Sequence, residues 1–123
     1  DPVFARGLKR MGDAVSRQLH DALEALSRQD AAMAVSVIRQ DDDIDRHQDA
    51  LLRSILTQLS SEPDSINAGW NFLFIVKNFE RIGDHCTNIA KTVHYIATGE
   101  RVAEDELGDM SVGADQNALE EQG

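Results

Sequence analysis

Residues 34–59 read AVSVIRQDDDIDRHQDALLRSILTQL, and their apolar side chains recur at the three- and four-residue steps of an α-helix. One line along this helix comprises Ala34, Ile38, Asp41, Asp45, Gln48, Leu52, Ile55 and Leu59. Two acids therefore fall within an otherwise apolar line, about one helical turn apart, with Cβ atoms roughly 5–6 Å from each other. A rival line through Val37, Ile44 and Leu51 leaves a second interpretation open, in which the helix is rotated and both acids face solvent.

Two further amphipathic segments flank this helix. The segment before it has an apolar line at Phe4, Leu8, Met11, Val15, Leu19, Leu23 and Leu26. The segment after it runs to Thr98 and has a line at Phe72, Val76, Phe79, Gly83, Cys86, Ala90 and Val93. Asp30 is placed to cap the start of the central helix, Glu62-Pro63 to end it, and Gly99 to end the last helix. Three such helices with short connections predict an all-α fold, an antiparallel three-helix bundle over residues 1–99.

The formal net charge of −10 is concentrated at the C-terminal end of the chain. Residues 100–123 contain eight acids and one base, whereas residues 1–99 contain fourteen acids and eleven bases. The sequence therefore predicts an acidic disordered tail over residues 100–123. The bundle has no basic stripe and no aromatic platform, which argues against nucleic-acid binding.

Hydropathy and cysteine usage indicate where the protein acts. The longest apolar run, residues 72–76, is far shorter than the roughly 20 residues that cross a bilayer, so no membrane insertion is expected. No secretion signal opens the chain, and its single cysteine cannot close an internal disulfide. A cytoplasmic location is therefore expected. Because the chain starts at Asp1 and not at methionine, we expect it to be part of a longer protein.

A second pair of acids, Glu80 and Asp84, has the same four-residue spacing on the last helix. If the two helices pack together, the carboxylates of Asp41, Asp45, Glu80 and Asp84 converge. Converging carboxylates must be solvated, protonated or neutralised by metal cations. An all-oxygen donor set favours hard cations such as Mg²⁺, Ca²⁺, Mn²⁺ or ferric iron over zinc and copper.

The residues around Asp84 bear on such a site. Gly83 costs about 1 kcal/mol relative to alanine inside a helix. A close backbone approach by another helix or by a ligand explains this glycine as well as relief of crowding around Phe79. Asn88 is a candidate to hydrogen-bond metal-bound carboxylates or to supply a carbonyl oxygen as a ligand itself, and His85 to act in the same way, although a solvent-facing His85 is the stronger interpretation. Two more interpretations concern single residues: Cys86 as a small buried hydrophobe, and Trp70 as a core residue or a dimer contact.

The segment Phe79-Glu80-Arg81-Ile82-Gly83-Asp84-His85-Cys86-Thr87-Asn88-Ile89-Ala90, together with Asp41-Asp42-Asp43-Ile44-Asp45, resembles the two acidic motifs of the PhoU family of phosphate-signalling regulators. The likeness extends from about Phe4 to Gly99. It covers one three-helix repeat of a family that usually carries two, and the chain looks like the C-terminal repeat. One departure is Lys91, which stands where an acid is common in the family.

The resemblance implies a non-enzymatic, cytoplasmic negative regulator of phosphate-starvation signalling and phosphate uptake. It implies contact with the ATPase of a phosphate ABC transporter and with a membrane sensor histidine kinase, and it implies a homodimer. It also implies that Asp41, Asp45, Glu80 and Asp84 hold metal ions. The spacing alone slightly favours acids that face solvent over acids that bind metal. With the resemblance to the family, metal binding becomes the favoured interpretation.

Two other classes of protein stay open as alternatives. A ferritin-like di-metal carboxylate enzyme uses Glu-x-x-His on its bundle helices, and none of the three predicted helices contains that pattern. No serine has a histidine and an acid placed to activate it, so no enzymatic activity is expected. The other alternative is a helical interaction module without metal, which metal analysis of the purified protein would distinguish.

Overall fold

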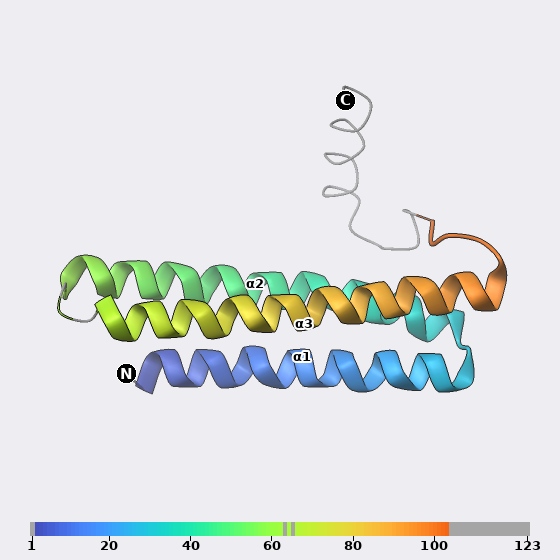
Figure 1. The fold of residues 1–123 in the computed structure, drawn as a ribbon, viewed down its shortest axis with the longest axis horizontal. Helices are drawn as coiled ribbons and strands as arrows, with labels where there is room; N and C mark the ends of the chain where they lie inside the picture. The colour runs from blue at the N-terminus through green and yellow to red at the C-terminus, as the bar shows by residue number, and fades with distance from the viewer. Residues whose placement is uncertain (1, 63, 65, 104–123) are drawn as a thin grey trace, which may run out of the picture.

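The computed structural model describes residues 2–62, 64 and 66–103. Three helices, α1 (Pro2–Arg28), α2 (Ala31–Ser61) and α3 (Ile66–Thr98), lie side by side, and α2 runs opposite to the other two (Figure 1). Every pair of helices is in contact, and the described residues contain no strand. The prediction of an all-α antiparallel three-helix bundle is confirmed. Residues 104–123 of the predicted acidic tail lie outside the described residues.

Helices in proteins gain most of their stability from packing, and the apolar faces of these three helices meet inside the bundle. No described helix combines the length and the apolar character that a bilayer span requires. The positions of the apolar residues therefore decide which side chains each helix presents to its neighbours.

The helix ends follow the predicted capping residues. The Oδ1 atom of Asp30 accepts a hydrogen bond from the backbone N–H of Met33 at 3.0 Å, which caps the start of α2. Gly99 has a positive φ of 75°, and its N–H donates to the carbonyl oxygen of Tyr95 at 2.7 Å, which ends α3. Gln29 takes the left-handed conformation with a φ of 51°. Because of this turn, Gln29 and Asp30 alone connect α1 to α2.

The core consists of two apolar clusters that follow each other along the bundle. The first cluster contains Phe4, Leu8, Met11, Val15, Ile44, Leu51, Ile55 and Val76. The second cluster contains Ala22, Ala25, Ala34, Val37, Ile38, Cys86, Ala90 and Val93. Cys86 is buried, as predicted. Each cluster takes residues from all three helices, so both hold the bundle together.

A polar layer separates the two clusters and consists of Gln18 on α1, Asp41 on α2 and Gly83 on α3. On each helix, this residue lies between the positions that enter the first cluster and those that enter the second. The three residues are in contact: Gln18 Nε2 lies 3.5 Å from Asp41 Oδ1, and a Cβ at Gly83 would lie 3.3 Å from Gln18 Oε1. The core is therefore interrupted at one level by polar atoms.

On α1, the predicted apolar line is wrong in its second half. Leu19, Leu23 and Leu26 are 38%, 50% and 47% exposed. The buried residues there are Gln18, Ala22 and Ala25. The leucine positions and the buried positions both have helical spacing, so periodicity does not distinguish the two faces. Packing selects the face with the smaller side chains, because small residues allow helices to pack closely.

On α2, the rival line faces the core. Val37, Ile44 and Leu51 are buried, which leaves Asp41 half-buried at the edge of the core and Asp45 exposed. The apolar members of the first line also belong to the core: Ala34, Ile38 and Ile55 are buried, and Leu52 and Leu59 are partly buried against the first cluster. The prediction fails only at its polar positions, where Asp45 is exposed and Asp41 half-buried. The line predicted on α3 is confirmed, with Phe72 and Phe79 partly buried at its edge.

The surroundings of Gly83 and Gly12 show which side chains these two glycines make room for. A Cβ at Gly83 would lie 3.3 Å from Gln18 Oε1 and 3.4 Å from Asp41 Oδ1, so Gly83 admits polar groups of α1 and α2. The crowding around Phe79 occurs elsewhere, because a Cβ at Gly12 would lie 3.2 Å from Phe79 Cζ. At Gly83 the nearest atoms are side-chain oxygens of α1 and α2 and not Phe79, so crowding around Phe79 does not explain this glycine, and the close approach of another backbone or a ligand stays a prediction.

Replacing Ile55 by alanine is expected to lower the free energy of unfolding by about 2–5 kcal/mol, because Ile55 is fully buried in the first cluster. Leu56→Ala is the matched control, since Leu56 is 58% exposed and its loss should change stability by less than about 0.5 kcal/mol. Urea denaturation followed by circular dichroism measures both variants. Equal destabilisation by the two changes would contradict the assignment of the core.

Candidate metal centre

The four predicted metal-binding acids lie where α2 and α3 pack together. Because the two helices are antiparallel, Asp41 lies near Asp84 and Asp45 lies near Glu80, and the charges of each pair repel each other. Asp41 and Glu80 are half-buried, whereas Asp45 and Asp84 are exposed. The structure thus gives two cross-helix pairs in place of one point at which all four acids converge.

Asp41 is the more confined member of its pair. Burial raises the pKa of Asp41 above its ordinary value of 3.8. A hydrogen bond from Gln18 acts in the opposite direction, while the negative charges of Asp84 and Asp42 raise this pKa further. Asp41 therefore occupies a place where an added positive charge is favourable.

Asp45 experiences a local excess of negative charge. The pKa of Asp45 is raised from 3.8 to about 6, and the largest cause is the loss of water from the part of this otherwise exposed side chain that the protein covers. Repulsion from Asp41, Asp42 and Asp49 on its own helix, and from Glu80 on α3, acts in the same direction. An added positive charge is therefore also favourable next to Asp45 and Glu80.

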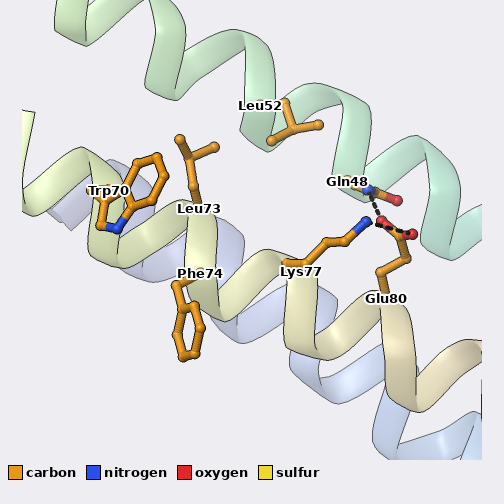
Figure 2. A pocket seen from close by; sticks show the side chains of 7 residues that line it. All are labelled: Gln48, Leu52, Trp70, Leu73, Phe74, Lys77 and Glu80. Atoms are coloured by element: carbon orange, nitrogen blue, oxygen red, sulfur yellow. Dashed lines mark hydrogen bonds and ion pairs between the residues drawn. The ribbon is translucent and has the colours of Figure 1, made fainter.

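Glu80 is held by neighbours on both helices (Figure 2). Gln48 of α2 donates from Nε2 to Glu80 Oε2 at 2.5 Å, and Lys77 of α3 donates from Nζ to Glu80 Oε1 at 3.4 Å. Hydrogen bonds to a charged acceptor fix the orientation of the carboxylate. A cation at Glu80 must therefore share these two oxygens with Gln48 and Lys77 or displace the donors.

The carboxylate oxygens of both cross-helix pairs fit a hard cation, but each pair contains only two carboxylates. Across residues 2–62, 64 and 66–103, no three side chains of histidine, cysteine, aspartate or glutamate stand close enough together to hold a metal ion. The polar layer improves the fit at Asp41. Gln18 Oε1 is buried without a hydrogen-bond partner in the described part of the chain, and Gly83 leaves open the space that a Cβ would fill beside it. The Asp41–Asp84 pair is the better candidate of the two, because carboxylate and amide oxygens are the donors that Mg²⁺, Ca²⁺ and Mn²⁺ prefer.

His85 and Asn88 lie beside a different groove. This groove has a volume of about 560 Å³ and is lined by Leu26 of α1 and by His85, Asn88, Ile89, Thr92 and Val93 of α3. Both side chains are exposed. Because this groove opens on the α1 side of α3, support of the acids by His85 and Asn88 stays a prediction.

An apolar groove continues from Glu80 along α2 and α3, and we call it the Trp70 groove. It has a volume of about 400 Å³ and is lined by Gln48, Leu52, Trp70, Leu73, Phe74, Lys77 and Glu80 (Figure 2). Trp70 is 70% exposed and Phe74 is 65% exposed, so the interpretation of Trp70 as a core residue is wrong. Large exposed aromatic side chains beside a groove are typical of a protein contact surface.

Sequence reasoning missed Gln18. Its side chain is fully buried, and it donates from Nε2 to the carbonyl oxygen of Val37 at 3.2 Å. Glutamine is rarely fully buried, so a search for apolar lines passes over it. The signal that could have found it is its spacing, three residues after Val15 and four before Ala22, on the face that the core selects.

Sequence reasoning also missed a contact made by the first residues after α3. His94 is 5% exposed, and its Nδ1 atom lies 2.9 Å from the carbonyl oxygen of Glu100. Val102 packs against the second apolar cluster. Part of the segment predicted as a tail therefore contacts the bundle beyond Gly99.

Comparison with known proteins places these features in a family. The family model described as "PhoU domain" matches residues 8–93. A relative from Caulobacter vibrioides, named phosphate-specific transport system accessory protein PhoU homolog, is 42% identical over 104 residues, or 83% of this chain and 45% of the relative. The protein of the same name from Rhizobium meliloti is 39% identical over 96 residues, which cover 78% of this chain and 40% of the relative.

A less similar relative matches over a comparable share of each chain. The phosphate-specific transport system accessory protein PhoU of Escherichia coli is 31% identical over 113 residues, or 89% of this chain and 47% of that protein. The chain thus spans about half the length of the curated relatives it matches. No solved structure matches the chain significantly.

The raised pKa of Asp45 predicts how stability depends on pH. The folded chain holds this proton more tightly than the unfolded chain, so the contribution of Asp45 to the free energy of unfolding falls as pH rises from about 4 to about 6. The unfavourable contribution is absent below this range and complete above it. Asp45→Asn is therefore expected to stabilise the protein at pH 7 and not at pH 4, by a small amount because solvent screens an exposed side chain.

Urea denaturation at a series of pH values measures this effect. Asp43→Asn is the control, since Asp43 is an exposed acid of α2 that pairs with Arg46. A wild-type protein whose stability rises through this pH range relative to Asp45→Asn would contradict the sign.

Proposed function

The chain belongs to the PhoU domain family, and on that basis we propose that it is a negative regulator of phosphate-starvation signalling and phosphate uptake. Its relatives are named as accessory proteins of a phosphate-specific transport system, which supports a role beside a transporter. In this proposal the protein acts in the cytoplasm, contacts the ATPase of a phosphate ABC transporter and a membrane sensor histidine kinase, and catalyses no reaction. The observation that carries the proposal is the family match over residues 8–93, which includes both acidic pairs.

We assign the binding of hard cations, such as Mg²⁺, Mn²⁺, Ca²⁺ or iron, to the two cross-helix pairs of acids. Asp41 with Asp84 holds one cation and Asp45 with Glu80 a second, so each ion joins α2 to α3. A bound cation supplies positive charge that offsets the repulsion across the pair. Because it binds the folded chain and has no such site in the unfolded chain, it stabilises the contact between the two helices.

Replacing both Asp41 and Asp84 by asparagine is expected to lower the metal content and to leave the helicity nearly unchanged, because asparagine keeps the shape and removes the charge. Elemental mass spectrometry after loading with Mn²⁺ and desalting measures the first quantity, and circular dichroism the second. Asp43→Asn combined with Asp49→Asn is the control, since it removes the same charge from exposed positions of α2. Unchanged metal content in the Asp41 and Asp84 double variant would discard the metal assignment.

We propose that the Trp70 groove is the face through which two copies of the chain form a homodimer. Ile66, one turn before Trp70, is 59% exposed and extends the apolar surface of Trp70 and Phe74. Association removes such a surface from water, which is the main favourable contribution to protein contact. Glu80 lines the same groove, so the charge state of the Asp45–Glu80 pair lies next to the dimer contact.

Trp70→Ala combined with Phe74→Ala is expected to convert the dimer to a monomer, because it removes the exposed aromatic side chains of the groove. Light scattering over a range of protein concentrations measures the mass. The control is Tyr95→Ala combined with Ile96→Ala, two residues near the other end of α3 that are each 55% exposed. As the single tryptophan of the chain, Trp70 also reports association through its fluorescence. A wild-type chain that is monomeric at all concentrations would refute the dimer.

The same variants test the proposed function. Immobilised wild-type chain should capture the purified transporter ATPase and the kinase, and its expression should lower phosphate uptake and repress a phosphate-starvation reporter. The Tyr95 and Ile96 double variant should act as wild type. Failure of the wild-type chain to capture either protein, with no change in uptake or reporter, would overturn the proposed function.

A further inference from the structure

The amide group of Gln18 has one fixed orientation. Its Nε2 atom lies 3.2 Å from the carbonyl oxygen of Val37 and 3.5 Å from Asp41 Oδ1. Both neighbours are hydrogen-bond acceptors, so the NH₂ end of the amide must face them and the oxygen must face the other way. The position of Gln18 Oε1 therefore follows from its surroundings on α2.

Gln18 Oε1 lies beside Gly83 of α3. The atom is buried and has no hydrogen-bond partner in the described part of the chain, although buried amide oxygens are normally paired. The absent side chain of Gly83 leaves a space that is bordered by Gln18 Oε1 at 3.3 Å and Asp41 Oδ1 at 3.4 Å from the position of a Cβ. Two oxygen atoms from two helices thus border one space, next to Asp84 on the third.

We propose that Gln18 Oε1 is a ligand of a hard cation that is also held by Asp41 and Asp84. This inference rests on the metal binding proposed above and deepens it. The acids alone provide two carboxylate ligands at this place, and the amide oxygen is a third protein ligand. The three ligands come from α1, α2 and α3, so the bound ion connects all three helices where the two apolar clusters separate.

The donor set indicates which ions fit. One neutral amide oxygen and two carboxylates carry less charge than the four acids together, and they leave further coordination positions to water. All donors are oxygens, which favours Mg²⁺, Mn²⁺ or Ca²⁺ over zinc and copper. Gly83 contributes by leaving room beside both oxygens, since a Cβ at this position would lie 3.3 Å from Gln18 Oε1 and 3.4 Å from Asp41 Oδ1.

Binding of Mn²⁺ to the whole chain tests the assignment, with free Mn²⁺ measured by electron paramagnetic resonance. Gln18→Met removes the oxygen and the NH₂ group at similar volume, and it should weaken binding at the site by about tenfold or more. Gln18→Glu restores an oxygen but not the donor group, and it should bind Mn²⁺ at least as tightly as wild type. Gly83→Ala fills the space with a residue that favours helix, so it should weaken binding without lowering the melting temperature of the metal-free chain.

The control is Gln40→Met. Gln40 also joins α1 to α2 through an amide–carboxylate hydrogen bond, from Nε2 to Asp21 Oδ2 at 2.9 Å, outside the polar layer. This variant should bind Mn²⁺ as wild type does. The melting temperature of each metal-free variant shows whether it is folded. If a Gln18 variant does not fold, Gly83→Ala still tests the assignment.

Three results would overturn the assignment. The first is wild-type affinity in Gln18→Met. The second is an affinity of Gln18→Glu as low as that of Gln18→Met, which would show that the NH₂ group orients Asp41 and that the oxygen binds nothing. The third is wild-type affinity in Gly83→Ala. Loss of binding in Asp41→Asn with retention in Gln18→Met would reject the ligand role alone, whereas a wild-type chain that takes up no Mn²⁺ would reject the proposed metal centre with it.

Discussion

The rest of the structure depends on one constraint, the burial of polar atoms between two apolar clusters. Gln18 is fully buried, and Asp41 is half-buried beside it. A buried polar group without a partner costs about 1–3 kcal/mol, and Gln18 Oε1 is such a group in the described part of the chain. An apolar residue at position 18 would join the two clusters into one core. Residues that lower stability in this way are expected where a protein binds something.

The same constraint extends to the contact between α2 and α3. These two helices share the most extensive contact in the bundle, and this contact brings Asp41 next to Asp84 and Asp45 next to Glu80. Apolar packing on both sides of the pairs holds like charges close together. Glu80 lies both next to Asp45 and in the Trp70 groove. In the proposed function, a cation held by these acids therefore lies beside the proposed protein contact.

Three surfaces of the bundle show how far a sequence pattern can be trusted. The apolar line of α3 was predictable because small and apolar residues recur on one face from Phe72 to Val93. On α1, the leucines at 19, 23 and 26 are more hydrophobic than the line that is buried, so hydrophobicity pointed to the wrong face. Glutamine and alanine are buried there instead, because side-chain volume decides which residues fit between packed helices. The pairing of acids across α2 and α3 needed the register of the two helices, which no local pattern contains.

By itself, the sequence determined the three helices, their caps at Asp30 and Gly99, and the acidic pairs at four-residue spacing. These features depend on contacts between residues close in the chain, which helical periodicity reports. Only the tertiary structure decided which face of α1 and α2 is buried, that the acids form two cross-helix pairs, and that Gln18 joins Asp41 and Gly83 in one layer. Those outcomes depend on contacts between residues far apart in the chain, where volume and burial outweigh hydrophobicity at any single position.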